Sequence, residues 1–355
     1  MERNKNENVN EAKSGLEVAI MLTFFVRVET LSRVFEQIRK ARPKTLFLAS
    51  DGPREGREDD IIKVQNCRTI VSNVDWECDV HRYYSDENLG ILLNSRNAKR
   101  EAFKLVDKCI FLEDDMLPSQ DFFDFCNDML KIYENDKRVS IISGANPYDL
   151  GLSNGDGYFF VKHATSGATA YWRRTYFALN NLRQKIITFG GLTKDELSKL
   201  PSNTRRNIEK RLKKQINQMN GLYLSGELVR FIHFFIGDNL GIMPNVNLVS
   251  SISISKDSAH SYDDLRKLPK VLRNLQRYPI SKLNYSTSVV TNPAENIQIR
   301  QKIYRILAIG HPFVQFFRWV QTFFLILKYG STAELRRKLF KWLKNKLTTH
   351  NDING

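Results

Sequence analysis

The feature of this sequence that most limits its fold is the alternation, in its first half, of short apolar runs with segments of helical periodicity. Residues 18–24 (VAIMLTF) are continuously apolar and rich in β-branched side chains, which is typical of a strand buried on both faces. Apolar residues then recur at the spacing of one helix face: Leu31, Val34, Phe35 and Ile38. Pro43 ends this segment, and residues 45–49 (TLFLA) form a second strand-like run. The pattern predicts a β-α-β unit.

The alternation continues with three further strands and two further helices. The strands are expected near 80–84, 109–112 and 139–143, and the helices near 94–106 and 120–133. Strands separated by helices predict a parallel sheet, so the expected fold class is α/β with a mostly parallel central sheet flanked by helices. Ligands of such open sheets bind beyond the carboxyl ends of the strands, so the residues that follow each strand are candidates for the chemistry.

Charged residues follow several of these strands. Arg27 follows the first, Asp51 lies in a Ser-Asp-Gly-Pro sequence after the second, and the acids Glu113, Asp114 and Asp115 follow the strand at 109–112. Adjacent carboxylates at a strand end favour a hard divalent cation such as Mg²⁺ or Mn²⁺. The alternatives are a chance acidic triplet, a simple turn at the Asp-Gly-Pro sequence, and a surface charge at Arg27.

The net charge of +15 is concentrated in one part of the chain. Between residues 266 and 346 there are 17 Lys and Arg but only two Glu, so this segment carries the whole excess. The change near residue 265 predicts a nearly neutral domain followed by a basic segment. We therefore expect a disordered tail at 1–15, a globular domain at 16–265, a basic, aromatic-rich helical extension at 266–347 and a tail at 348–355.

Composition excludes several other classes of protein. Hydrophobic residues make up 42% and charged residues 26% of the chain, as in ordinary globular proteins, so wholesale disorder and a polytopic membrane protein are excluded. The four cysteines contain no Cys-x-x-Cys pair, so neither a zinc finger nor a disulfide scaffold is expected. Few cysteines and no predicted bridges favour a reducing, cytoplasmic location.

Several motifs, in order, resemble one enzyme family. FLEDDMLPSQDFFDFCNDML followed by RVSIISGAN resembles the metal-motif segment of GT-A-fold glycosyltransferases, which use nucleotide-sugar donors. The resemblance is to the branch containing the N-acetylglucosaminyltransferase that initiates complex N-glycans and many bacterial cell-surface glycosyltransferases. It extends over about 18–262, through FFVRVETLSRVFEQIRKARPKTLFLASDGPRE, ENLGI, ATAYWRR and GIMPNVNLVSSISISKDSAHS. It implies a GT-A-type sheet.

The resemblance also implies roles for the residues after the strands. Asp115 would be a direct metal ligand and take part in catalysis, Asp114 would face the donor ribose, and Glu113 would face the donor sugar. Arg27 and Asp51 would bind the nucleotide, and an Asp at that position suits a hydrogen bond from a uracil ring nitrogen.

Four further residues are assigned by the resemblance. Asn88 and Arg96 would line the donor pocket, although Asn-Leu-Gly is also ordinary turn chemistry. Glu227 occupies the place of the catalytic base, where the bacterial group usually has an Asp between aromatic residues; here the neighbours Gly226 and Arg230 depart from that pattern. A helix-start carboxylate is the alternative for Glu227. His260 resembles a histidine that completes the metal site or touches the diphosphate, with a solvated loop histidine as the alternative.

The function that this resemblance implies is metal-dependent, inverting transfer of a sugar from a nucleotide-diphosphate donor, preferably UDP-linked, to a hydroxyl of a surface polysaccharide or lipid-linked glycan. Mn²⁺ or Mg²⁺ is the expected cofactor. A sugar-phosphate nucleotidyltransferase is the first alternative, but it would be expected to carry a glycine-rich loop after the first strand, where FFVR has none. A non-catalytic basic protein that binds RNA or membranes is the second, and no nucleic acid is expected because the positive charge lies outside the globular domain.

The basic segment predicts an anchor on an anionic membrane surface. Residues 304–347 mix aromatic side chains with Lys and Arg, a composition typical of helices that lie in the headgroup plane. Charged residues and Pro312 interrupt the apolar stretch at 304–329, so it is not expected to cross a bilayer. The expected location is therefore cytoplasmic and peripheral, on the inner face of the membrane. Aromatic residues that complete a core or a dimer interface are the alternative.

Overall fold

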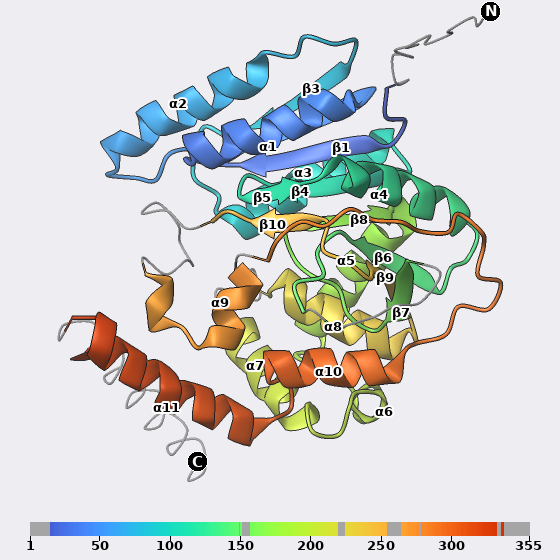
Figure 1. Ribbon diagram of the computed structural model, residues 1–355, viewed down its shortest axis with the longest axis vertical. Coiled ribbons are helices and arrows are strands. Elements are labelled where there is room, and N and C mark those ends of the chain that lie inside the picture. The colour runs from blue at the N-terminus through green and yellow to red at the C-terminus, as the bar shows by residue number, and fades with distance from the viewer. Residues whose placement is uncertain are drawn as a thin grey trace, which may run out of the picture.

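The structure is a computed structural model, and it describes residues 15–148, 150, 157–218, 224–253, 264–276, 278–331 and 335–336. It contains a large central sheet with helices on both faces (Figure 1). The strands of this sheet, in chain order, are β1 (Ala19–Phe24), β2 (Thr45–Ser50), β3 (Asp79–Tyr84), β4 (Lys108–Glu113), β6 (Val139–Ser143), β7 (Tyr158–Val161), β8 (Ala168–Trp172) and β9 (Leu240–Pro244).

The eight strands are arranged in the order β3-β2-β1-β4-β8-β6-β9-β7. Strands β8 and β7 run antiparallel to their neighbours, while the others share one direction. The predicted α/β fold with a mostly parallel sheet is confirmed, and the five predicted strands lie within one residue of their expected bounds. The antiparallel β8, inserted between β4 and β6, was not predicted, because sequence periodicity does not specify strand direction.

Helices cover both faces of the sheet. One face packs against α1 (Val28–Ala41), α2 (Glu58–Ser72) and α4 (Gln120–Ile132), and the other against α3 (Ile91–Leu105), α5 (Arg173–Thr188), α8 (Gly226–Ile236) and α10 (Ile297–Leu307). In β1, Ile20 and Leu22 belong to the first core and Met21 to the second. Because successive side chains of a strand point to opposite faces, a continuously apolar strand serves two cores.

A short two-stranded sheet lies beside the carboxyl end of β4. Its strands β5 (Met116–Pro118) and β10 (Val249–Ser251) pair antiparallel, with Met116 opposite Ser251. The Ile252 amide then donates to the Asp115 carbonyl at 2.8 Å. This contact holds the acidic triplet against a segment that lies more than a hundred residues later in the sequence.

Part of the basic segment packs onto the globular domain. The Leu283 amide donates to Asp121 of α4 at 2.9 Å, and the Tyr285 hydroxyl donates to Asp128 at 2.7 Å. Further along, Ile303 and Tyr304 of α10 are buried in the second core. The domain boundary at 265/266 stays a prediction. Residues that follow the change in charge still pack against the globular domain.

The remaining helices are α6 (Lys194–Lys199), α7 (Arg205–Asn217), the 3₁₀ turn η2 (Leu265–Lys267), α9 (Lys270–Gln276) and α11 (Pro312–Tyr329). Helix α11 lies at one edge of the molecule, packed on η2 (Figure 1). Within the described ranges, no helix has the length and apolar character needed to cross a membrane.

Candidate active site at the carboxyl end of the sheet

Arg27 and the acidic triplet meet at the edge where β1 and β4 end. Arg27 Nη1 lies 2.9 Å from Asp114 Oδ1 and 2.6 Å from Asp115 Oδ2. The Phe25 amide also donates to Asp114 Oδ2, at 3.1 Å. Strand β1 pairs with β2 on one side and β4 on the other, so this edge is the point where the strand order reverses. Open α/β sheets bind ligands at such a point.

Asp114 and Asp115 are buried, Glu113 is half-buried, and the triplet is only partly neutralised. Burial raises the pKa of the Asp114 carboxyl to about 7, opposed by the Arg27 guanidinium. Burial, followed by the neighbouring Asp115 charge, also raises the pKa of Glu113. Asp114 and Asp115 therefore share one directly bound guanidinium, and Glu113 lies beside them without a bond to it among the described residues, an arrangement in which an added cation is stabilising. Arg27 forms ion pairs with Asp114 and Asp115, and its predicted nucleotide-binding role stays a prediction.

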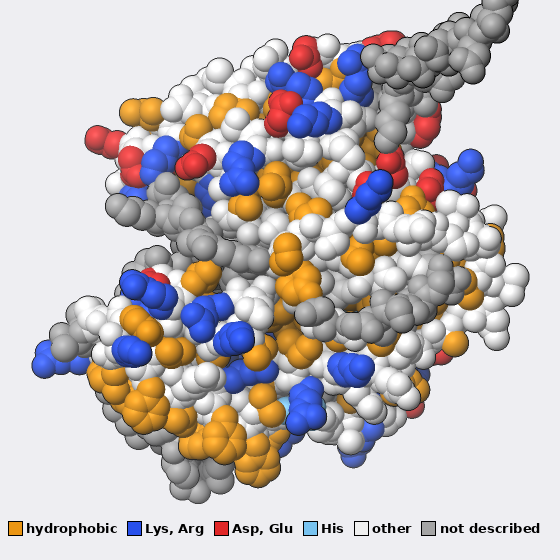
Figure 2. Space-filling view, viewed as in Figure 1, with side chains coloured by type: hydrophobic (Ala, Val, Ile, Leu, Met, Phe, Trp, Pro, Cys, Tyr) orange, Lys and Arg blue, Asp and Glu red, His pale blue; other side chains and the backbone are white. Residues whose placement is uncertain are grey.

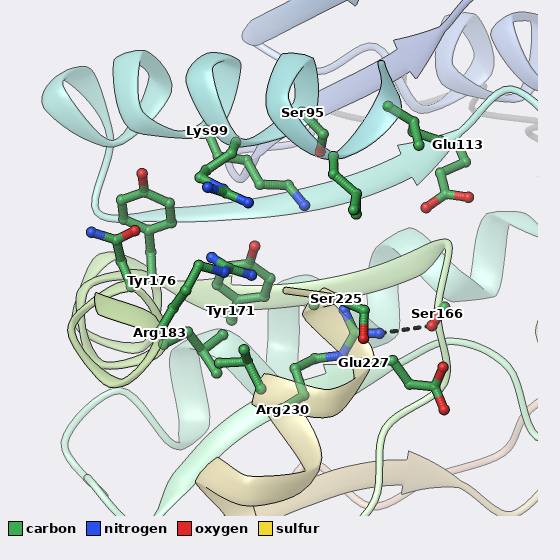
Figure 3. A pocket seen from close by; sticks show the side chains of 17 residues that line it. Ser95, Lys99, Glu113, Ser166, Tyr171, Tyr176, Arg183, Ser225, Glu227 and Arg230 are labelled. Atoms are coloured by element: carbon green, nitrogen blue, oxygen red, sulfur yellow. Dashed lines mark hydrogen bonds between the residues drawn. The ribbon is translucent and has the colours of Figure 1, made fainter. Parts of the chain in front are cut away.

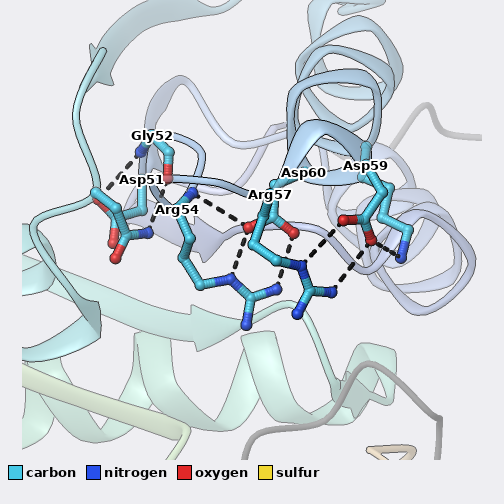
Figure 4. Close-up of polar contacts among 8 residues, drawn as sticks. Asp51, Gly52, Arg54, Arg57, Asp59 and Asp60 are labelled. Atoms are coloured by element: carbon cyan, nitrogen blue, oxygen red, sulfur yellow. Dashed lines mark hydrogen bonds and ion pairs between the residues drawn. The ribbon is translucent and has the colours of Figure 1, made fainter.

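Asp51 and Asn88 link the loops that follow β2 and β3. Asp51 Oδ1 accepts hydrogen bonds from the amides of Gly52 at 3.1 Å and Leu89 at 2.8 Å, and Asn88 Nδ2 donates to the Gly52 carbonyl at 2.8 Å (Figure 4). Burial raises the pKa of Asp51, opposed by these amides. In this structure both residues hold the loops together, which is the turn role left open by the sequence; the nucleotide-binding role of Asp51 and Asn88 stays a prediction.

A second contact fixes the loop after Asp51. The guanidinium of Arg54 makes two parallel bonds to Asp60 at the start of α2, at 2.6 and 2.8 Å (Figure 4). Its central carbon lies 5.5 Å from the centre of the Phe25 ring. Bidentate pairs of this kind constrain geometry as well as adding energy, so the loop is held against the end of β1.

A cavity of about 370 Å³ lies beside the acidic triplet, between α3, α5 and α8. Three of the predicted residues line it: Arg96 from α3, Glu113 from the end of β4 and Glu227 from the first turn of α8. Arg27, Asp51, Asn88, Asp114 and Asp115 are not among its lining residues. Figure 3 shows Glu113 and Glu227 toward one end of this cavity and Lys99 and Arg183 toward the other.

Glu227 stands at the start of α8, beside two cavities. Ser225 caps this helix by accepting a hydrogen bond from the Leu228 amide, so Glu227 is free of the capping role and its side chain is exposed. A second cavity, of about 260 Å³, also reaches Glu227 and is lined on its far side by Leu307, Ile309 and Gln315 near the start of α11. A carboxylate between two cavities is placed to contact ligands entering from either.

Three cationic residues of the first cavity have no site role predicted from the sequence: Lys99, Arg183 and Arg230. They come from α3, α5 and α8, and the only sequence signal is that Arg230 falls four residues after Gly226, in a motif that departs from the family pattern. Arg230 Nη2 donates to Ser166 Oγ at 2.7 Å (Figure 3). Side chains on separate helices converge through packing, which local sequence patterns do not specify.

The predicted metal ligand His260 lies outside the described residues. Within the part of the chain that the structure describes, no group of three or more His, Cys, Asp or Glu side chains is arranged to hold a metal ion. Asp115 is therefore the one predicted metal ligand whose surroundings are described, and its role as a ligand stays a prediction. Its Oδ2 is paired with Arg27.

Comparisons with known proteins return structural neighbours but no relatives by sequence. No protein-family model and no curated protein matches this chain. A mannosyltransferase from Pyrobaculum calidifontis, solved with GDP-mannose and Mn²⁺, superposes on 94% of this chain and 81% of its own, with 11% identity and a TM-score of 0.41. The galactosyltransferase LgtC, solved with donor and acceptor sugar analogues, covers 63% of this chain and 73% of its own, at 9% identity and a TM-score of 0.33. Similarity at this level leaves the function to be argued from the residues themselves.

Proposed function

We propose that this protein is a glycosyltransferase that moves a sugar from a nucleotide-diphosphate donor to a hydroxyl of a surface polysaccharide or lipid-linked glycan. The observation that carries the proposal is the placement of Arg27, Asp114 and Asp115 at the strand-order reversal, beside a cavity that contains Glu113 and Glu227. Such a site combines a cation-binding acidic cluster for a diphosphate with a separate carboxylate for an acceptor hydroxyl.

The acidic triplet has the donor chemistry for Mg²⁺ or Mn²⁺. Both ions prefer carboxylate oxygens, and Asp114 and Asp115 supply them from adjacent positions that are buried and held by one guanidinium. Asp115 would hold the ion, with His260 as a further candidate ligand. When bound, the ion supplies positive charge to the leaving diphosphate. Arg27 orients both carboxylates and adds a second positive charge at the same edge of the sheet.

Glu227 is proposed as the base for an inverting reaction. An inverting transferase needs one carboxylate that accepts the proton of the attacking hydroxyl. Glu227 has an exposed side chain, lines the same cavity as Glu113, and is not used to cap α8. The first turn of a helix stabilises the ionised form of a carboxylate, which is the form that a base requires.

A panel of nucleotide diphosphates tests the proposed donor class. UDP, GDP and ADP are each added with and without Mn²⁺, and the unfolding temperature of the full chain is measured. UDP with Mn²⁺ should raise the midpoint by about 2–4 °C at a hundredfold excess over its Kd, because a ligand that binds the native state stabilises it. UDP without metal should give a much smaller shift. No shift with any nucleotide and metal would contradict the glycosyltransferase proposal, and preference for GDP would contradict the UDP assignment alone.

Helix α11 is proposed to bind an anionic membrane surface. Five of its exposed apolar side chains form one stripe at spacings of three, four and seven residues: Phe313, Phe316, Phe317, Phe324 and Leu327. Trp319 and Tyr329 are also exposed and lie outside this stripe. Its buried Ile326 lies on the opposite face. An amphipathic helix of a globular protein normally turns its apolar stripe inward, so an outward stripe marks an interaction surface.

Basic side chains border this stripe. Figure 2 shows hydrophobic side chains gathered along the lower edge of the molecule, with Lys and Arg beside them. The exposed basic residues on α11 and the neighbouring η2, α9 and α10 are Arg266, Lys270, Lys302, Arg305 and Lys328. Aromatic insertion flanked by basic residues favours the headgroup region of an anionic bilayer. The more distal segment, 337–347, is outside the described residues. This surface supports a peripheral location on the inner face of the membrane.

Sedimentation with lipid vesicles tests the membrane surface. The full chain should bind vesicles containing phosphatidylserine more tightly than neutral ones, and salt should weaken the binding. Replacing Phe313, Phe317 and Phe324 by Ser should reduce binding about tenfold or more, because each inserted ring contributes apolar burial. The control is Phe177→Ser, which removes an exposed ring from α5. Equal binding by the triple variant, or no preference for anionic vesicles, would contradict this surface.

A further inference from the structure

The cavity between α3, α5 and α8 is more cationic than a neutral sugar requires. Four basic side chains line it, namely Arg96, Lys99, Arg183 and Arg230, against two acids, Glu113 and Glu227. The acids lie toward one end and Lys99 and Arg183 toward the other (Figure 3). Lys99 and Arg183 therefore lie in the part of the cavity that is farther from Glu227, whereas Arg230 bonds Ser166 nearer to Glu227 (Figure 3).

The guanidinium groups of Arg183 and Arg230 are incompletely bonded. The Nε atoms of both are buried without a hydrogen-bond partner among the described residues. A Cβ atom built on Gly226 would lie 3.8 Å from Arg230 Nη1 and 3.9 Å from Arg183 Nη2, so both groups flank the same point over the start of α8. Buried donors without partners are costly, and they are rare in native structures unless a ligand completes them.

Lys99 adds a third incompletely paired cation. Its ammonium lies 4.7 Å from the centre of the Phe111 ring, and the described residues give it no ion pair. Burial, followed by the nearby Arg230 charge, lowers the pKa of Lys99 to about 8. Burial, followed by Arg96, lowers the pKa of Arg183 to about 10. The pKa values of Lys99 and Arg183 are lowered for the same physical reason: positive charges lie close together, away from water, with too little negative charge beside them.

We propose that this cavity binds an anionic group, a carboxylate or a phosphate ester, carried by a sugar substrate. This proposal rests on the glycosyltransferase function and names the chemistry of one of its substrates. A carboxylate or phosphate placed between Lys99, Arg183 and Arg230 would accept charged hydrogen bonds from all three and supply the missing negative charge. The anionic group belongs either to the donor sugar, as in a uronic acid, or to the acceptor, as in a phosphorylated sugar.

Inorganic phosphate is the first probe, because it tests the cavity independently of any sugar transfer. Phosphate should raise the unfolding temperature of the full chain relative to chloride at equal ionic strength. The variants Lys99→Met and Arg183→Gln should bind phosphate at least about tenfold more weakly, the loss expected for removing a charged hydrogen bond. Arg183→Lys should restore part of the binding. The control is Lys104→Met, which removes an exposed cation from the same helix.

A second readout separates a ligand site from a structural role. Without ligand, Lys99→Met should unfold at a higher temperature than the unmodified protein, since it removes a half-buried charge that has too little compensation. A residue needed only for packing would give a lower unfolding temperature. Lower stability of the free variant together with unchanged phosphate binding would overturn the proposal.

Matched sugar pairs then identify the substrate that carries the anion. UDP-glucuronic acid is compared with UDP-glucose for the donor, and glucose 6-phosphate with glucose for the acceptor in the presence of UDP and Mn²⁺. One charged member should bind at least about tenfold more tightly than its neutral partner, and Lys99→Met should remove that difference. UDP binding should be unchanged by Lys99→Met; loss of UDP binding would assign the cations to the diphosphate and overturn the proposal. Phosphate binding without binding of UDP, GDP or ADP would leave the anion site intact and contradict the glycosyltransferase function instead.

Discussion

Asp115→Asn is expected to abolish metal-dependent sugar transfer while leaving the protein folded. An amide oxygen lacks the charge that holds a divalent cation, and metal charge stabilisation is worth several kcal/mol in a transition state. The expected loss of kcat/KM is therefore about a thousandfold or more. The Asp115 carbonyl still accepts from the Ile252 amide, so the contact between β5 and β10 is preserved.

The measurement is initial rate against Mn²⁺ concentration, with circular dichroism to check the fold. The control is Asp75→Asn. It alters an exposed carboxylate that follows α2 and pairs with Arg39 of α1. Arg27→Met provides a second comparison, because it removes the ion pair while keeping both carboxylates. Turnover by the Asp115 variant at the normal rate, with a normal response to Mn²⁺, would rule out this residue as the metal ligand.

Glu227→Gln is expected to reduce turnover by about 10² to 10⁴, the range associated with the loss of general acid–base catalysis. Glutamine is close in size but cannot accept the proton of the acceptor hydroxyl. Donor binding should be unchanged, because Glu227 lies apart from the Arg27–Asp115 pair and lines a different part of the site. The reduction should appear in kcat, with the Kd for UDP and Mn²⁺ preserved.

Glu209→Gln is a suitable control, since it changes an exposed carboxylate on α7. Two measurements separate the outcomes: kcat from initial rates and the anomeric configuration of the product by nuclear magnetic resonance. An unchanged kcat would place the base elsewhere. A product that keeps the donor configuration would contradict the inverting reaction, and Glu227 would then need another role.

The sheet could be predicted in part because short stretches of neighbouring residues indicate where its strands lie. Four of the five expected strands are mostly apolar runs of strand length, and burial on both faces makes such runs continuous rather than alternating. The fifth, β3, is a partly exposed edge strand with the sequence DVHRYY. The antiparallel β7 and β8 and the small β5–β10 sheet were not anticipated, because pairing with a distant strand leaves no periodic signal. The same limit applies to residues 283–304. They belong to the segment whose overall basic composition indicated an extension, but their contacts with α4 and the second core place them on the globular domain.

The site divides in a similar way. Residues that follow a strand were found because parallel strands bring their carboxyl ends to one edge, and Arg27, Asp114 and Asp115 do lie together there. Lys99, Arg183 and Arg230 were not predicted as site residues, because they lie within helices that meet only in the folded chain. Asp51 was predicted to bind the nucleotide because it follows a strand, yet its described bonds are from backbone amides. Which partners it has depends on how the loop after β3 folds over it.

The sequence by itself determined the alternation of strands and helices, the edge at which the acids gather and the concentration of positive charge near the end of the chain. Those properties depend on spacing and composition, which act between neighbours in the chain. Only the tertiary structure decided that α11 turns Phe313 and Phe317 outward, that Arg27 pairs with Asp115, and that three cations from separate helices share one cavity. These depend on which surfaces pack together and on how deeply each charge is buried, and both are set by contacts between residues far apart in the sequence.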